Sequence, residues 1–327
     1  MILITGAAGY IGSHTALQFL ENGSEIIIFD NLETGHIETI ETLKKEYPLI
    51  FIKGDLRNKK DISDVFEHYS ITSVIHFAGY AIVEESVKNP LKYYNNNVIG
   101  TLNLLNAMLE YNVKKIVFSS TCATYGEPKY LPIDENHSQN PVNPYGQTKL
   151  IIEKILKDYD KAYSLKSIIL RYFNVAGCDD KIRIGEWHSP ETHLIPNILK
   201  SAVLNEFQFK IFGNDYDTID GTCIRDYVNV NDLAKAHLLA YNYLDRENKS
   251  EIFNLGTEKG FSVKEIFDTC QKVLNEKLSV CYEHKRVGDP AKLYANSTKA
   301  KQFLGWEVEH SIEDSIKTAY EWEKKLK

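Results

Sequence analysis

A glycine-rich turn near the N-terminus constrains the fold of this chain of 327 residues more than any other feature. It follows an apolar run, Ile2 to Ile4, that is typical of a buried strand, and helical periodicity begins directly after it. Glycines permit a tight turn and let the backbone approach a phosphate, whose charge is attracted by the N–H groups of the helix start. Because the turn lies between a strand and a helix, it predicts a dinucleotide site. The expected phosphate contacts are Gly6, Gly9, Tyr10, Ile11 and Gly12.

Strands and helices alternate through the first half of the chain. Apolar runs predict strands at 25–29, 49–53, 73–77, 113–120 and 165–171. The alternation predicts an α/β fold, with a doubly wound parallel sheet that is Rossmann-like and has right-handed crossovers. Beyond Asn174 the sequence is irregular, which indicates a smaller C-terminal α/β substrate domain at the carboxyl edge of the sheet. We expect a nucleotide-binding domain at 1–176 with a return segment near 224–250, and a substrate domain mainly at 177–327.

The second predicted strand ends in Asp30, which is followed by Asn31. A carboxylate at the tip of this strand can accept hydrogen bonds from the ribose hydroxyls of adenosine, and it repels a 2′-phosphate. No Arg or Lys follows immediately to offset that repulsion, so the sequence predicts NAD as the cofactor rather than NADP. A simple turn residue is the alternative interpretation of Asp30.

Three later segments complete the expected cofactor site. Asp55, after the third strand, is a candidate for the adenine edge, with a cap of the next helix as the alternative. Ala78 and Gly79 follow the fourth strand, where small residues would let the cofactor pass close to the backbone. A long helical pattern at 90–111 contains Asn95, Asn96 and Asn97. We expect at least one of these amides to turn inward and hold a loop or the cofactor.

A tyrosine and a lysine one helical turn apart form the main candidate for catalysis. Tyr145 follows Pro144, which suits the first helical position, so Tyr145 and Lys149 share one face of a helix. A nearby ammonium favours the phenolate and lowers a tyrosine pKa from its usual value of about 10. Thr121, where the strand at 113–120 ends, adds a hydroxyl for the same substrate oxygen. The three groups suit proton transfer to or from an alcohol, and a chance YxxxK motif on a solvated helix face is the alternative.

Charge, cysteine content and hydropathy exclude several classes of function. The net charge of −7 argues against nucleic acid and anionic membranes as partners. The five cysteines are scattered and show no CxxC spacing, so we expect neither a disulfide framework nor a metal site. The N-terminus reads as a strand rather than a signal peptide, and no apolar run could span a bilayer. These features predict a cytoplasmic protein.

Several motifs together resemble those of the extended short-chain dehydrogenase/reductases, and within them the UDP-glucose (UDP-galactose) 4-epimerases. The resemblance covers nearly the whole chain. The motifs of the first half are Gly6–Gly12, Asp30–Asn31, Gly54–Leu56, His76–Gly79, Ser119–Thr121 and Tyr145–Lys149. The motifs of the second half are Leu170–Asn174, Gly213–Tyr216 and Asp220–Val228, and the run from Phe212 to Tyr227 is the most specific.

The resemblance implies inversion at C4 of a UDP-hexose through a transient 4-keto sugar, with NAD as hydride carrier. Tyr145 would be the general base, Lys149 the partner that lowers its pKa and binds the nicotinamide ribose, and Thr121 the hydroxyl that aids proton transfer. The implied NAD contacts beyond the glycine turn are Asp30, Asn31, Asp55, Leu56, Phe77, Ala78, Gly79, Asn96, Ser119, Tyr145, Lys149 and Phe173. The implied UDP-sugar contacts are Thr121, Tyr145, Asn174, His193, Leu194, Phe212, Arg225, Arg286, Asp289 and Leu293.

Three positions depart from the pattern of relatives. Ala81 stands where several relatives carry a Lys that contacts the cofactor. His193 stands where some relatives have Asn, and it could still donate a hydrogen bond to phosphate or sugar, or be neutral to function. Leu293 stands where epimerases that exclude N-acetylated sugars have a bulky Tyr. The smaller side chain predicts a pocket that also accepts UDP-GlcNAc and UDP-GalNAc.

Other functions of the same scaffold stay open. A sugar-nucleotide 4,6-dehydratase commonly has acids directly after the catalytic Thr, where this chain has Cys122 and Ala123. A UDP-glucuronate 4-epimerase is a further alternative, although no added basic residue points to a carboxylate. A net dehydrogenase would release NADH at each turnover, and a non-catalytic NAD-dependent regulator usually lacks the Tyr–Lys pair. The resemblance also implies a homodimer formed by the helices at 90–111 and 144–163.

Overall fold

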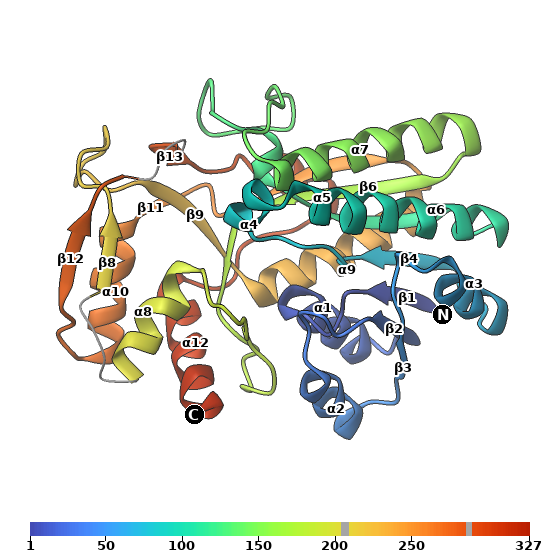
Figure 1. Cartoon of the computed structure of the whole chain (residues 1–327), viewed down its shortest axis with the longest axis horizontal. Helices are drawn as coiled ribbons and strands as arrows, with labels where there is room; N and C mark the ends of the chain where they lie inside the picture. The colour runs from blue at the N-terminus through green and yellow to red at the C-terminus, as the bar shows by residue number, and fades with distance from the viewer. Residues whose placement is uncertain (204–208, 286–289) are drawn as a thin grey trace.

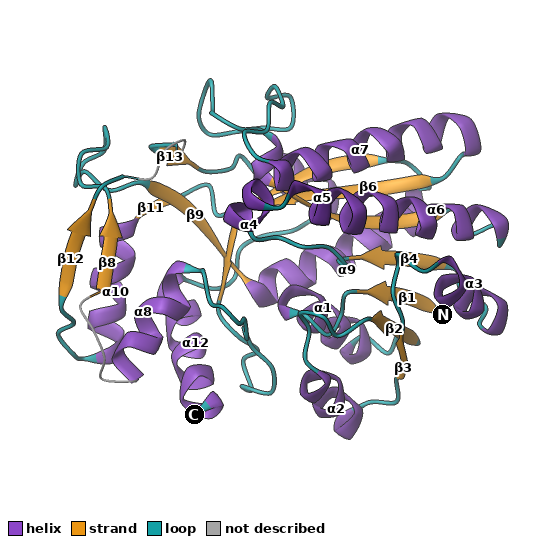
Figure 2. Ribbon diagram, viewed as in Figure 1, coloured by secondary structure: helices purple, strands orange, loops and turns teal. Residues whose placement is uncertain are grey.

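The computed structural model describes residues 1–203, 209–285 and 290–327 of the chain (Figure 1). Its centre is a seven-stranded parallel sheet with the order β10-β6-β5-β4-β1-β2-β3 (Figure 2). The strands are β1 (Ile2–Thr5), β2 (Ile26–Asp30), β3 (Ile50–Lys53), β4 (Ser73–His76), β5 (Lys115–Thr121), β6 (Lys166–Tyr172) and β10 (Glu251–Leu255). The order reverses between β1 and β4, where doubly wound sheets bind their ligands. The predicted fold class is confirmed.

Helices cover both faces of this sheet, which explains the continuous apolar runs of its strands. In β1, Ile2 and Ile4 pack into one core and Leu3 packs into the opposite one. The first core contains residues from α1 (Tyr10–Glu21), α2 (Ile37–Glu46), α9 (Val230–Glu247) and α11 (Thr298–Leu304). The second contains residues from α3 (Lys59–His68), α6 (Gly100–Glu110) and α7 (Pro144–Tyr163).

The helical pattern expected at 90–111 forms three consecutive segments after the short helix α4 (Val83–Lys88). They are α5 (Pro90–Tyr93), a π-helix (Tyr94–Ile99) and α6. A π-helical turn is rare and recurs at functional sites. It contains the three consecutive asparagines, of which Asn97 is buried.

The second half of the chain builds a separate group of elements, on the left of Figure 1. Strands β7 (Asn174–Ala176), β9 (Ile224–Asn229), β11 (Gly260–Ser262) and β13 (Lys292–Leu293) form one sheet, and β8 (Phe209–Phe212) pairs with β12 (Val280–Glu283). Helices α8 (Leu194–Val203), α10 (Val263–Leu274) and α12 (Ile312–Leu326) share a third core. The capping boxes at Ser262 and Ser311 start α10 and α12. Between these elements the chain returns to the main sheet through α9 and β10. The domain boundaries stay a prediction.

Among the helices of the described residues, none combines the length and the apolar character that crossing a bilayer requires.

A buried ion pair ties α7 to the sheet. The guanidinium of Arg171 on β6 donates to both carboxylate oxygens of Glu153 on α7, at 3.0 and 2.6 Å. Glu153 also accepts from Ser120, the residue before Thr121, and from Gln139. The remaining Nη1 of Arg171 donates to the hydroxyl of Tyr125 at 2.9 Å. Only 3% and 4% of the two charged side chains are exposed, so these hydrogen bonds replace the water that burial removes.

We predict that Arg171→Met lowers the free energy of unfolding by about 3–5 kcal/mol, because it leaves the Glu153 carboxylate buried without its cation. Urea denaturation followed by circular dichroism measures the change. Lys115→Met is the matched control, since it removes an ion pair with Asp245, whose side chain is 60% exposed. Equal losses in the two variants would contradict the role assigned to the buried pair.

Candidate active site

The predicted glycine turn packs tightly against the sheet. Gly6 has a φ of +77°, and a Cβ there would lie 2.5 Å from the backbone nitrogen of Ala78. A Cβ on Gly12 would lie 2.4 Å from the carbonyl oxygen of Gly6. Both positions require glycine because the opposing atoms belong to the backbone. Gly9, the N-cap of α1, has no side chain to bond the first N–H groups of the helix, so this cradle fits the pyrophosphate of a dinucleotide.

Asp30 holds this turn from the end of β2. Its Oδ2 accepts a hydrogen bond from the N–H of Ala8 at 3.0 Å, and its Oδ1 accepts one from Leu32 at 2.8 Å. Burial raises the pKa of Asp30, although both hydrogen bonds oppose the shift. Each carboxylate oxygen can accept more than one hydrogen bond, so Asp30 keeps the capacity to bind ribose hydroxyls.

The fold brings a basic residue, Arg57, beside Asn31 and Asp55, which sequence reasoning missed. Its guanidinium lies 2.8 Å from Glu33 and 2.5 Å from Asp55, and Asn31 donates to Asp55 at 3.1 Å. Hydrogen bonding to Arg57 lowers the pKa of Asp55 to about 2. Because two carboxylates bind this guanidinium, its charge is already balanced, and the site keeps its preference for a ribose without a 2′-phosphate.

Asn97, rather than Asn96, is the amide that turns fully inward. Its Oδ1 accepts from the N–H of Tyr80 at 2.9 Å, and its Nδ2 donates to the carbonyl of Tyr80 and to Thr148, each at 3.1 Å. Asn97 thus fixes the segment after β4 to helix α7. Asn96 is partly buried and donates to Asn97 at 3.1 Å. Its predicted contact with the cofactor stays a prediction.

Thr121, Tyr145 and Lys149 meet at the carboxyl end of the sheet. Thr121 is the last residue of β5, before a short 3₁₀ turn (Cys122–Thr124), and Tyr145 is the second residue of α7. The Thr121 hydroxyl lies beside the phenol of Tyr145 and favours its ionised form. The Nζ of Lys149 donates to the carbonyl oxygen of Ser119 at 2.8 Å and lies 3.8 Å from where a Cβ on Gly79 would be. The structure therefore unites the three predicted catalytic groups with two predicted cofactor contacts.

The pKa values of the pair differ from the sequence-based expectation. Desolvation raises the pKa of Tyr145 to about 12, although the neighbouring Thr121 hydroxyl opposes this shift. Desolvation also lowers the pKa of Lys149 to about 8, while Glu153 opposes that shift. The spacing of the motif suggested a lowered tyrosine pKa. Burial has the larger effect here because it disfavours the charged form of both groups.

Leu293 lies in the same region as the predicted catalytic groups. It packs against a small apolar cluster that contains Phe173 and Cys122, the neighbour of Thr121. Leu293 also pairs in register with Arg225, where β13 runs parallel to β9. Arg225 is buried, and its Nη1 donates to the carbonyl of Ile224 at 2.7 Å. Leu293 is therefore a neighbour both of Phe173, which is expected at the site of hydride transfer, and of Arg225, which is expected to bind the diphosphate.

The other predicted substrate contacts lie on the second half of the chain. Asn174 begins β7 and pairs with Tyr227, and Phe212 ends β8 with a side chain that is partly exposed to solvent. Leu194 begins α8, and His193 directly before it turns its Nδ1 toward Glu186. Arg286 and Asp289 lie outside the described residues.

Comparisons with known proteins agree with this geometry. The family model described as NAD dependent epimerase/dehydratase family matches residues 2–256. This chain belongs to that family. It is 50% identical to a UDP-glucose 4-epimerase of Halalkalibacterium halodurans, over 99% of this chain and 95% of that protein.

Solved structures of family members have the same fold. A UDP-glucose 4-epimerase from Brucella ovis in complex with NAD superposes with a TM-score of 0.93 at 42% identity, over 98% of this chain and 97% of that chain. The UDP-Glc/GlcNAc 4-epimerase from Campylobacter jejuni superposes with a TM-score of 0.87 at 42% identity, over 99% of each chain. The predicted membership of an epimerase family and the predicted cofactor, NAD, are confirmed.

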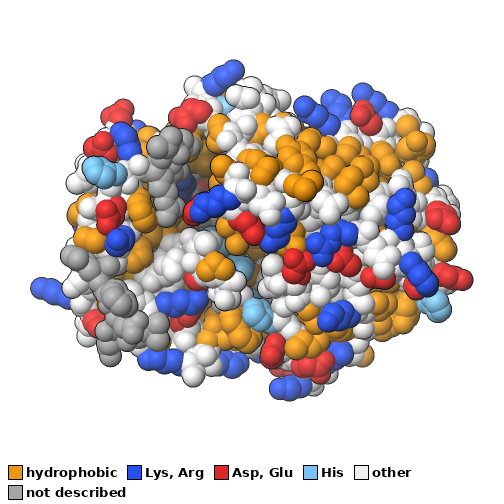
Figure 3. Space-filling model, in the orientation of Figure 1, with side chains coloured by type: hydrophobic (Ala, Val, Ile, Leu, Met, Phe, Trp, Pro, Cys, Tyr) orange, Lys and Arg blue, Asp and Glu red, His pale blue; other side chains and the backbone are white. Residues whose placement is uncertain are grey.

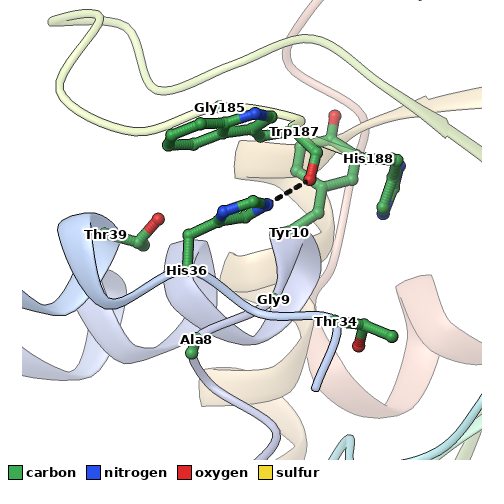
Figure 4. A pocket seen from close by; sticks show the side chains of 9 residues that line it. All are labelled: Ala8, Gly9, Tyr10, Thr34, His36, Thr39, Gly185, Trp187 and His188. Carbon is green, nitrogen blue, oxygen red and sulfur yellow. Dashed lines mark hydrogen bonds between the residues drawn. The ribbon is translucent and has the colours of Figure 1, made fainter. Parts of the chain in front are cut away.

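The glycine turn of this family member borders a pocket that sequence reasoning did not find (Figure 4). The ring of Trp187 stacks on His36 with centroids 3.9 Å apart, and the His36 Nε2 lies 3.0 Å from the Trp187 carbonyl oxygen. His188 stands beside Tyr10 on the other side of this pocket. The contact between His36 and Trp187 joins residues 151 positions apart, so no local sequence signal could have shown it.

Proposed function

We propose that this protein is an NAD-dependent isomerase that interconverts UDP-glucose and UDP-galactose by inversion at C4. The observation that carries the proposal is the placement of the Thr121 hydroxyl beside the phenol of Tyr145, with Lys149 one turn further along the helix. This group lies at the carboxyl edge of the sheet, close to the glycine cradle. Identity of 50% over nearly the full length to a protein named UDP-glucose 4-epimerase supports the proposal.

Each catalytic side chain has a distinct task. Tyr145 takes the proton of the sugar 4-hydroxyl and later returns it, and Thr121 hydrogen-bonds to the same oxygen. Lys149 keeps most of its positive charge at neutral pH, because its pKa of about 8 lies above that pH, and this charge favours the phenolate. NAD, when bound, supplies the hydride acceptor and donor that protein side chains cannot provide.

The remaining contacts are assigned to the two ligands on the basis of their positions. We assign Asp30, Asn31, Asp55, Leu56, Phe77, Ala78, Gly79, Asn96, Ser119 and Phe173 to NAD, together with the glycine turn. We assign Asn174, His193, Leu194, Phe212, Arg225 and Leu293 to the UDP-sugar, and Arg286 and Asp289 by resemblance alone. The planar guanidinium of an arginine suits two oxygens of a diphosphate.

The alternative reactions have less support. A 4,6-dehydratase would need acids after Thr121, and Cys122 there is buried in a small hydrophobic cluster. Burial raises the pKa of the Cys122 thiol to about 12, so it is a poor acid or nucleophile at neutral pH. A UDP-glucuronate 4-epimerase would need a cation for the extra carboxylate.

We also propose that the protein acts as a homodimer in the cytoplasm. Three apolar side chains around α5 are exposed, Val87 by 60%, Leu91 by 76% and Ile99 by 46%. Hydrophobic side chains gather over α5 and α7 in Figure 3. A second copy that covered this face would remove the patch from water.

Sedimentation equilibrium should give twice the chain mass for the wild type and a lower mass for Leu91→Lys, because the added charge would disrupt the apolar contact. A monomeric wild type would contradict the dimer.

Replacing Tyr145 by Phe should reduce kcat with UDP-galactose by about 10²–10⁴-fold, because it removes the only proton acceptor proposed at C4. Binding of UDP, measured by calorimetry, should stay nearly unchanged. Tyr69→Phe, just after α3 and outside the site, serves as the control and should keep full activity. Unchanged turnover in Tyr145→Phe would reject the assignment.

A second prediction concerns the range of UDP-sugars that the enzyme accepts, and it depends on Leu293. Wild-type enzyme without added reductant should interconvert both UDP-Gal and UDP-GalNAc, with products resolved by chromatography. Leu293→Tyr should lower kcat/KM for UDP-GalNAc by at least about tenfold while UDP-Gal is still converted, because the added ring fills the space for the acetamido group. Leu293→Met, of similar volume, should keep both activities. A wild type that converts only UDP-Gal would leave the epimerase assignment intact and reject the argument from Leu293.

A further inference from the structure

Four side chains from one short segment converge beside the glycine turn. Glu186, His188, Glu191 and His193 each bring one nitrogen or oxygen atom into a group in which all four atoms lie within 4.8 Å of one another. They all belong to the eight residues before α8. We propose that this cluster binds one divalent transition metal ion, and that zinc is the ion it fits best.

The separations between donor atoms suit a tetrahedral ion. The Nδ1 of His188 lies 3.1 Å from Glu186 Oε1 and 3.7 Å from Glu191 Oε2. The Nδ1 of His193 contacts Glu186 Oε1 directly and lies 3.6 Å from Glu191 Oε1. Zinc at its usual distances of about 2.0–2.2 Å from nitrogen and oxygen would separate its ligands by about 3.4 Å. Small rotations of these side chains would therefore bring two imidazoles and two carboxylates around one ion.

A buried oxygen without a hydrogen bond points to a missing ligand. The side chain of Glu191 is only 5% exposed, and its Oε2 has no hydrogen-bond partner among the described residues. The nearest cation, the Nζ of Lys200, lies 3.6 Å away. Leaving a charged oxygen buried without a hydrogen bond is unfavourable, and a metal ion at the centre of the cluster would satisfy it.

A network of ion pairs is the competing explanation for the cluster. Although burial opposes the shift, the hydrogen bond to Glu186 and the negative charge of Glu191 raise the pKa of His188 to about 9. Two protonated imidazoles would balance two carboxylates, as a zinc ion with two neutral imidazoles would. The two arrangements differ at Glu191 Oε2, which the ion-pair network leaves without a hydrogen bond.

The position of the cluster gives the ion a structural role. His188 packs edge-on against Tyr10 of the glycine turn, with ring centroids 6.3 Å apart. The backbone carbonyl of Glu186 accepts a hydrogen bond from Trp322 on α12 at 2.8 Å. His193 directly precedes α8. An ion here would tie the nucleotide-binding turn to two helices of the second half, without taking part in chemistry at Tyr145.

The test uses the full chain, stripped of metal by dialysis against a chelator and titrated with zinc. We expect one zinc ion per chain by elemental analysis and a rise in Tm, because the ion binds the folded state. Replacing zinc by cobalt should give the visible absorption of a tetrahedral site.

Two conservative variants and one control locate the site. His188→Asn and Glu191→Gln should weaken zinc binding by about 100-fold or more, since loss of even an outer partner costs 10–100-fold. His68→Gln, an exposed histidine on α3, should bind zinc as the wild type does. Circular dichroism without metal checks that each variant is folded. Failure of the wild type to bind stoichiometric zinc, or equal binding by all four proteins, would overturn the proposal.

Discussion

The carboxylate of Glu153 lies at the junction on which the geometry of the proposed catalytic groups depends. It binds Arg171 on β6 and Ser120 on β5, so a single buried group joins a helix to two strands. Ser120 immediately precedes Thr121. Tyr145, Lys149 and Glu153 follow one another at four-residue intervals along one face of α7. The ion pair therefore fixes the position and rotation of α7 relative to β5. This in turn places Tyr145 beside Thr121.

The glycine turn and the segment from Glu186 to His193 form a second junction. Gly6 can approach Ala78 only because neither side carries a bulky group. The hydroxyl of Tyr10 donates to the carbonyl of Gly177 at 2.6 Å, so the same turn also contacts the second half of the chain. The proposed nucleotide site and the contact with the second half of the chain thus share one short piece of backbone. The proposed metal cluster lies against this piece.

Much of the site could be predicted because its signals are local. Pro144 at the first helical position and the apolar run after it placed Tyr145 and Lys149 on one helix face. Other features depended on distant contacts. Within the π-helical turn Asn97, not Asn96, is the fully buried amide. Arg57 reaches Asp55 and Glu33 only when the loops after β2 and β3 lie side by side. The raised pKa of Tyr145 follows from burial, which the spacing of a motif does not report.

The sequence by itself determined the parallel α/β fold, the glycine cradle and the choice of Thr121, Tyr145 and Lys149 as the proposed catalytic groups. Periodicity, glycine spacing and helix caps depend on neighbours within a few residues, so they can be interpreted without coordinates. Only the tertiary structure decided the convergence of Leu293 with Phe173, the stacking of Trp187 on His36 and the grouping of two glutamates with two histidines. These arrangements depend on side-chain directions and on packing between segments distant in the chain, and a linear pattern specifies neither.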